Sequence, residues 1–154
     1  MKRILLTALT AMTTFLAVGS ASAEETRHIK PSVPPLLVIV TSGDAQVQLM
    51  SMVLTMQSAQ QGAKTNVLLC GAAGDMALRD APNSVTAGQP LMNMSAQGLM
   101  KTVMEKTNTK VEVCAIYLPG KGLDQSALID GVTAADPVAV AKLMISRDTK
   151  IVSF

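Results

Sequence analysis

Short apolar runs alternate with helix-like segments along this chain. The runs are rich in Val, Leu and Ile, as in strands that are buried on both faces. The intervening segments are longer, and their boundaries carry helix-capping residues. The predicted strands are residues 36–40, 65–70, 111–116 and 150–154, and the predicted helices are residues 45–61, 95–107 and 137–146, with a short helix near 125–129.

Capping residues fix several of these boundaries. Asp44 precedes the first helix and Gly62 follows it, which are the residue types preferred at the two ends of a helix. Asn93 or Ser95 is expected to cap the second helix. Asp136 followed by Pro137 is a strong start signal for the last one. Residues 71–75 and 117–122 are predicted to be loops, and residues 76–90 a short helix followed by irregular chain.

Strands that alternate with helices predict parallel βαβ units in a layered α/β sandwich. Ligands of such sheets bind beyond the carboxyl ends of the strands. Three loops leave those ends, and they are expected to bring polar and thiol side chains to one rim. These side chains are Ser42, Asp44, Cys70, Asp75, Cys114 and Lys121.

The N-terminal segment is typical of a secretory signal peptide. Lys2 and Arg3 precede a largely apolar, uncharged stretch, and residues 21–23 (ASA) have the small-x-small pattern of a cleavage site. We therefore expect residues 1–23 to be removed, residues 24–35 to form a flexible lead-in, and residues 36–154 to form one domain. The expected location is the periplasm or the space outside the cell, which is oxidising.

Composition narrows the class of protein. The 154 residues are 49% hydrophobic, 16% charged and 2% aromatic. Lys2 and Arg3 are two of the 13 basic residues, so 11 basic and 11 acidic residues would balance in the mature chain. With no basic cluster and few aromatic residues, nucleic-acid binding is disfavoured. No second apolar run is long enough to span a membrane, so no membrane association is expected after cleavage.

The first predicted helix has no charged residue between Asp44 and Lys64. A solvated helix face normally carries Lys and Glu. We therefore expect this helix to pack against another subunit, or alternatively to be central in its own domain. Its polar positions fall on one stripe: Gln48, Ser51, Thr55 and Ser58.

Cys114 is the candidate reactive residue. It lies at or near the end of a predicted strand, where its thiol can face the ligand rim, and Lys121 or backbone N–H groups can lower its pKa. The alternative is a small buried hydrophobic residue. Cys70 ends the preceding strand. If the first strand lies between these two, about 9–10 Å separates them, since each strand step is ~4.8 Å. A disulfide needs Cα atoms within about 7 Å, so both are predicted to be free thiols, with Cys70 structural.

The methionines and the remaining polar residues suggest few other chemistries. Two of the 11 methionines, Met1 and Met12, lie in the signal, and most of the others cluster near two predicted helices. Thioethers bind Cu(I), but filling of a core or interface is the simpler interpretation. The single histidine, His28, leaves no His-based triad, and two Cys with one distant His make no structural zinc site. No metal and no cofactor is predicted.

The order of these features resembles the DsrE/DsrF-like (DsrE, TusD and YchN-type) sulfur-relay superfamily. The similarity covers roughly residues 35–154, and the order of the pieces carries it. The matching segments are residues 36–42 (LLVIVTS), the helix to Gly62, residues 66–70 (NVLLC), 111–114 (VEVC), 120–123 (GKGL), 128–132 (LIDGV) and 151–154 (IVSF).

The resemblance implies a flavodoxin-like three-layer sandwich with a mostly parallel sheet of about five strands. It also implies a homo-oligomer, either a trimer or a hexamer, and a cysteine at the position of Cys114 that carries sulfur as a persulfide between donor and acceptor proteins. Ser42, Asp44 and Lys121 are then expected to line its pocket, with Cys70 as a secondary thiol. Relay members work in the reducing cytoplasm, whereas this chain has an export signal. The alternative function is therefore a non-catalytic binding module or oligomeric scaffold that binds Cu(I) through Met and Cys. A sulfur-relay component is favoured over a turnover enzyme.

Overall fold

The computed structural model describes residues 33–154 except Leu91. The predicted signal peptide, most of the lead-in and His28 therefore lie outside the described residues. Within the described chain, no helix is both long and apolar enough to cross a membrane.

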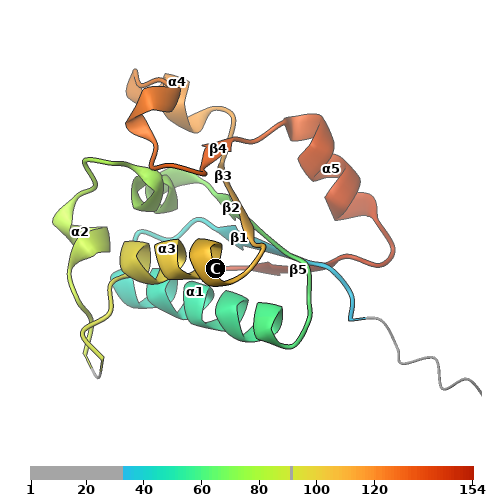
Figure 1. Cartoon of the computed structure of the whole chain (residues 1–154). Helices are drawn as coiled ribbons and strands as arrows, with labels where there is room; N and C mark the ends of the chain where they lie inside the picture. Colours follow the sequence, from blue (N-terminus) through green and yellow to red (C-terminus); the bar gives the residue numbers. More distant parts are fainter. Residues whose placement is uncertain (1–32, 91) are drawn as a thin grey trace, which may run out of the picture. The chain divides into compact units, whose positions relative to one another are not determined.

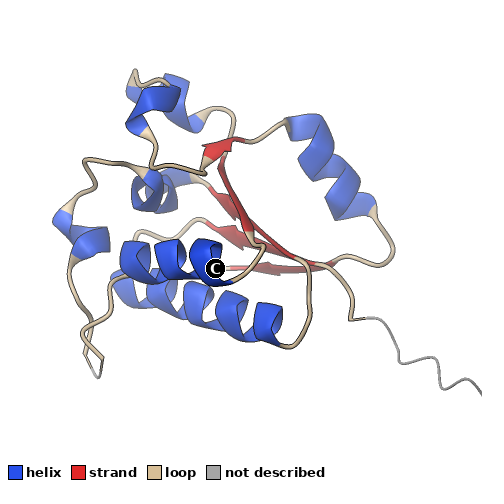
Figure 2. Ribbon diagram, in the orientation of Figure 1, coloured by secondary structure: helices blue, strands red, loops and turns tan. Residues whose placement is uncertain are grey.

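A five-stranded, wholly parallel sheet forms the middle layer (Figures 1 and 2). Helices α1 and α3 lie together on one face, and α5 lies on the other. This confirms the predicted three-layer α/β, flavodoxin-like class. The strands are β1 (Leu36–Val40), β2 (Thr65–Leu69), β3 (Lys110–Val113), β4 (Thr133–Ala134) and β5 (Lys150–Ser153). The helices are α1 (Ala45–Gln60), α2 (Asn83–Thr86), α3 (Ala96–Lys106), α4 (Tyr117–Lys121) and α5 (Pro137–Ile145), with 3-10 turns η1 (Gly71–Ala77) and η2 (Gln125–Ala127).

The strand order is β4-β3-β2-β1-β5, so the expectation that the first strand lies between the second and third is wrong. Helices α1 and α3 connect β1 to β2 and β2 to β3 on the same face of the sheet. Right-handed crossovers on one face add successive strands in one direction, so β2 lies between β1 and β3. Helix α5 is on the opposite face, and β5 accordingly returns to the free side of β1.

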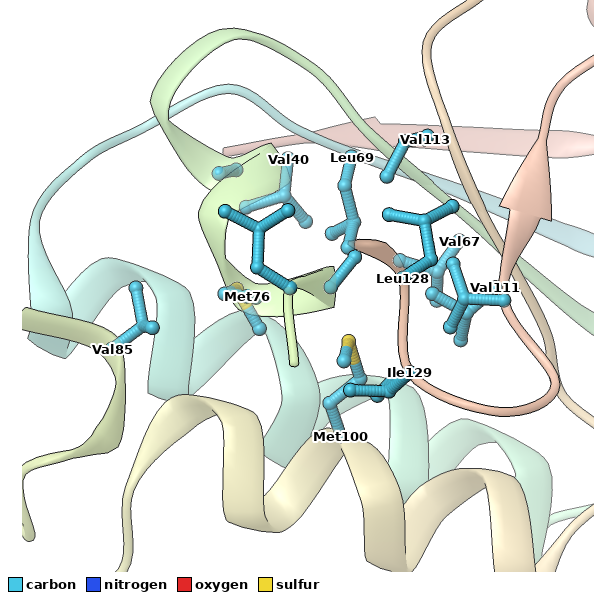
Figure 3. Packing of buried hydrophobic residues seen from close by; sticks show 14 of the residues in the cluster. Val40, Val67, Leu69, Met76, Val85, Met100, Val111, Val113, Leu128 and Ile129 are labelled. Carbon is cyan, nitrogen blue, oxygen red and sulfur yellow. The ribbon is translucent and has the colours of Figure 1, made fainter. Parts of the chain in front are cut away.

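The larger core lies between the sheet and the α1–α3 pair (Figure 3). Val40 and Leu69 of the sheet and Met52 and Met100 of the two helices are fully buried there. Alternate strand residues point to opposite faces, so Leu37 and Leu68 belong instead to a smaller cluster with Val140 and Leu143 of α5. The sheet is thus thickly covered on one face and covered by a single helix on the other.

Helix α1 buries its polar stripe. Gln48, Ser51 and Thr55 are fully buried. The hydroxyl groups of Ser51 and Thr55 donate hydrogen bonds to backbone carbonyls of the same helix, at 2.7 Å each, which removes most of the cost of burying them. Helix α1 packs against both the sheet and α3, which accounts for the lack of charge on its buried side. Its exposed side, which includes Met50 and Leu54, is uncharged as well. Contact of its exposed Met50 and Leu54 with another subunit stays a prediction.

Candidate functional site

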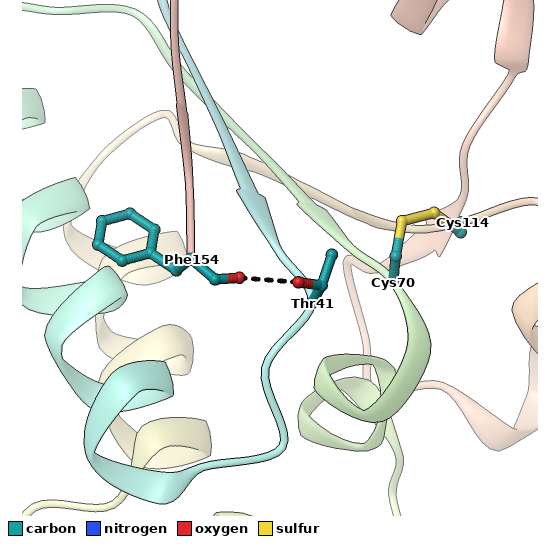
Figure 4. Close-up of a disulfide and its surroundings, with 4 residues drawn as sticks. All are labelled: Thr41, Cys70, Cys114 and Phe154. Atoms are coloured by element: carbon teal, nitrogen blue, oxygen red, sulfur yellow. Dashed lines mark hydrogen bonds between the residues drawn. A yellow bond between two sulfur atoms is a disulfide. The ribbon is translucent and has the colours of Figure 1, made fainter.

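The structure joins the two cysteines. Cys70 directly follows β2 and Cys114 directly follows β3, and these strands are hydrogen-bonded neighbours with Leu69 opposite Val113. The Cys114 N–H donates to the Leu69 carbonyl at 2.8 Å. The two Cα atoms are 5.1 Å apart, and the side chains form a disulfide (Figure 4). The prediction of two free thiols is therefore wrong, because it depended on the wrong strand order. The structural role predicted for Cys70 stays a prediction.

The disulfide is at the carboxyl edge of the sheet and is half-buried at both cysteines. Cys114 lines a surface pocket of about 280 Å³ that lies between β3 and α5, and Cys70 does not. Cys114 thus lies at the rim where it was predicted and is not fully buried. Its reactivity stays a prediction. Of the two sulfur-bearing residues, Cys114 is the one that a molecule in this pocket would meet.

A second link joins the segments that follow the two cysteines. Asp75 lies in η1, five residues after Cys70, and α4 begins three residues after Cys114. The Tyr117 hydroxyl donates to Asp75 Oδ1 at 2.6 Å, and Lys121 Nζ is 2.5 Å from the same oxygen. Lys121 Nζ also lies 5.5 Å from the centre of the Tyr117 ring. We call Asp75, Tyr117 and Lys121 the rim cluster.

The rim cluster changes two predictions. Residues 117–122 were expected to form a loop, but residues Tyr117–Lys121 form α4, which ends at Gly122 in the left-handed conformation (φ 65°). The ammonium group of Lys121 pairs with Asp75, so its predicted effect on the Cys114 thiol stays a prediction. Burial of Tyr117, with smaller contributions from the hydrogen bond and the charge of Asp75, raises the pKa of its phenol well above the ordinary value.

The sequence pattern does not indicate the contacts of two residues at this edge, Tyr117 and Gly74. Tyr117 falls within the predicted loop 117–122, yet it is the buried member of the rim cluster. Gly74 is covered by the Tyr117 ring so closely that a Cβ would collide with it. One feature of the sequence does single out Tyr117, because it is the only tyrosine of the chain.

Ser42 and Asp44 serve the start of α1. The Asp44 carboxylate accepts hydrogen bonds from the N–H groups of Gln46 and Val47, both at 2.9 Å, as predicted for a helix cap. The Ser42 hydroxyl accepts the N–H of Asp44 at 3.1 Å. Their predicted role in lining a ligand pocket stays a prediction.

Seven of the nine methionines in the described chain fall into two groups. Met52, Met76 and Met100 are fully buried in the core. A separate pocket of about 550 Å³ is lined by a further four, Met50, Met56, Met92 and Met94. Among residues 33–154 without Leu91, no group of three or more His, Cys, Asp or Glu side chains is placed to hold a metal ion.

Fold and site together define a class: a three-layer α/β protein with a wholly parallel sheet and a cysteine pair at the carboxyl ends of two adjacent strands. The sequence matches no protein-family model and no curated protein.

Two solved structures are similar to this fold. The YchN protein of Escherichia coli superposes with a TM-score of 0.61 at 19% identity, over 79% of this chain and 99% of that one. A protein of unknown function, MTH1491 from Methanobacterium thermoautotrophicum, gives 0.54 at 14% identity, over 77% and 96%. Both have the DsrE/DsrF-like fold, so the predicted resemblance is confirmed at the level of the fold.

Proposed function

We propose that this protein is exported to the periplasm and carries sulfane sulfur as a persulfide on Cys114, with Cys70 as the second, resolving thiol. The observation that supports this most is the position of Cys114, which is paired with Cys70 and also lines an open pocket at the carboxyl edge of a DsrE-like sheet. Homo-oligomeric assembly and the exchange of sulfur with donor and acceptor proteins belong to the same proposal.

In the reduced state the Cys114 thiolate attacks the terminal sulfane sulfur of a polysulfide. One S–S bond forms on Cys114, one S–S bond of the polysulfide breaks, and the shortened polysulfide leaves with the electron pair. Discharge without an acceptor follows when the Cys70 thiolate attacks the Cys114 sulfur. This restores the disulfide and releases hydrosulfide.

The oxidised state offers a second route to the same persulfide. Hydrosulfide attacks the Cys114 sulfur of the disulfide, a Cys114 persulfide forms, and Cys70 leaves as a thiolate. The disulfide is itself the oxidant, so no further electron acceptor is needed. This route suits an oxidising compartment, where the disulfide is the expected form.

Mass spectrometry of three proteins tests the proposal. Reduced Cys70→Ser, mixed with polysulfide, should gain about 32 Da per added sulfur, mapped to Cys114. Reduced wild type should instead end as the disulfide and release hydrosulfide, because Cys70 discharges the persulfide. Cys114→Ser should gain no sulfur. If Cys70→Ser stays unmodified, or if Cys114→Ser is modified equally well on Cys70, the carrier function is refuted.

The methionine-lined pocket supports a second candidate function, which is binding of a soft metal ion. Thioether sulfur is a preferred ligand of Cu(I), and Met50 and Met92 of this pocket are exposed. Anaerobic Cu(I) titration against a strong chelator should then give stoichiometric uptake that is lost in Met50→Leu/Met92→Leu and retained in Met144→Leu, whose side chain lies outside this pocket. Uptake equal in all three proteins, or none, would exclude the site.

A further inference from the structure

The pocket beside Cys114 has an uncharged, apolar wall. It lies between the residues that follow β3 and the inward side of α5. Its lining residues share small or aliphatic side chains, apart from the two sulfur-containing residues: Leu68, Cys114, Ala115, Ile116, Ala135, Pro137, Val140, Ala141 and Met144. A charged side chain of a bound segment that was buried against this wall would lose its hydration and would find no ionic partner there.

Large apolar side chains stand exposed around the same pocket. Ile116 is 81% exposed on one side, and Met144 of α5 is 48% exposed on the other. No residue of this nine-residue helix is fully buried. Val138 and Ile145 of α5 are also exposed, but they do not line the pocket. Exposed apolar groups that gather in one place mark interaction surfaces on soluble proteins.

The pocket gives access to one side of the disulfide. Cys114 is part of its wall, whereas Cys70 is not. A nucleophile that enters along the pocket therefore meets the Cys114 sulfur, and the Cys70 sulfur is the leaving group. This direction of attack fits the assignment of Cys114 as the sulfur that exchanges.

We propose that this surface binds a partner protein through an apolar, uncharged segment that carries a cysteine. The inference rests on the proposed function, since it names the partner class of the same Cys114 site. A volume of about 280 Å³ is slightly below the range of about 300–1,000 Å³ typical of small-molecule sites. It has room for one or two side chains of an extended segment, and Ile116 and Met144 extend the contact beyond it.

The exchange step is balanced without any further reagent. The partner's thiolate attacks the Cys114 sulfur, one S–S bond forms between the partner and Cys114, and the Cys70–Cys114 bond breaks. Cys70 takes the electron pair and leaves as a thiolate. The partner is then held as a mixed disulfide, which Cys70 can resolve by the reverse attack.

Thiol–disulfide exchange with synthetic peptides tests this partner class. Three peptides of equal length carry one central Cys, which is flanked by Leu, by Asp or by Lys. The rate at which each peptide reacts with the protein is divided by its rate with hydroxyethyl disulfide. This normalisation removes differences in thiol reactivity between the peptides. The normalised rate of the oxidised protein should be about tenfold higher with the Leu peptide than with the Asp or Lys peptide. A tenfold difference corresponds to about 1.4 kcal/mol of more favourable binding. The peptide should be found on Cys114.

Two substitutions on one helix provide the matched comparison. Met144→Lys places a charge at the pocket and should abolish the preference for the Leu peptide. Ile145→Lys places the same charge on the next residue, which is 81% exposed and does not line the pocket, and should leave the preference intact. Equal normalised rates for the three peptides, or equal loss in both variants, would overturn the partner class while exchange at Cys114 itself continues.

Two other outcomes have separate meanings. If neither peptides nor a small dithiol exchange with Cys114, the proposed function itself fails. If light scattering shows an oligomer that Met144→Lys dissociates and Ile145→Lys does not, a second copy of this chain occupies the pocket, and the partner segment is refuted.

Discussion

Loss of the Cys70–Cys114 disulfide is expected to lower the free energy of unfolding by about 4 kcal/mol, the value that the chain-entropy description gives for a loop of this length. The two cysteines are 44 residues apart in sequence. The bond therefore restricts the unfolded chain strongly, while in the folded protein the β2–β3 ladder already holds the two backbones together. Most of the change should accordingly come from the unfolded state.

Urea denaturation of wild type, oxidised and reduced, and of Cys70→Ser/Cys114→Ser measures this effect. The reduced wild type and the double variant should unfold at similarly lowered urea concentrations, with a steeper dependence on urea because the open chain exposes more surface. The reductant should not affect the double variant, which serves as its control. Equal midpoints for the oxidised and reduced proteins would show that the cysteines are not paired in solution.

Alkaline pH is expected to destabilise the protein through Tyr117. Burial, followed by the hydrogen bond and the charge of Asp75, raises the pKa of the folded phenol above its ordinary value of about 10. Between these two pKa values the unfolded chain has released a proton that the folded protein still holds. Stability therefore falls as the pH rises above about 10, and this contribution is fully present only below that pH.

The comparison of wild type with Tyr117→Phe isolates this group, because the variant lacks only the phenol hydroxyl. The free energy of unfolding of the variant should fall less steeply above pH ~10. The chain has one tyrosine and no tryptophan, so tyrosinate absorbance reports this phenol directly. Asp75→Asn should lower the pKa of Tyr117 without restoring its ordinary value, since burial is the larger cause, and Asp80→Asn should not change it. An ordinary tyrosine titration in the native wild type would contradict the buried rim cluster.

The elements that the sequence predicted well are those set by neighbouring residues. Asp44, Ser95 and Asp136 cap α1, α3 and α5 as expected, because a cap depends only on the next few N–H groups. The four longer strands were also predicted. The two-residue β4 was missed, because so short a strand leaves no pattern in the sequence, and α4 was missed because Pro119 and Gly120 are typical of a loop.

The errors at the site have one physical origin. Which strand borders β2 depends on the face against which α3 packs, and neither strand nor helix pattern contains that information. The wrong order separated Cys70 from Cys114 by two strand steps and excluded the disulfide that the structure contains. Cys114 was nevertheless placed at the correct edge, because every parallel strand delivers its following residue there. Asp75 was predicted at the same edge. Its hydrogen bond with Tyr117 could not be predicted, because it joins two segments that are far apart in the sequence and whose approach no local pattern indicates.

The rim cluster has a consequence for the resting condition of the protein. The β2–β3 ladder precedes the two cysteines, and the Asp75 bonds to Tyr117 and Lys121 follow them, so the chain is tied on both sides of the sulfur pair. Thiols confined in this way have a high effective concentration toward each other. Once an oxidant or another disulfide has reacted with one of them, the second thiolate displaces that group quickly and restores the disulfide. If the protein is exported as we propose, the disulfide is its expected resting form in that oxidising compartment, and keeping Cys114 as a free thiol would require a continuous supply of reductant.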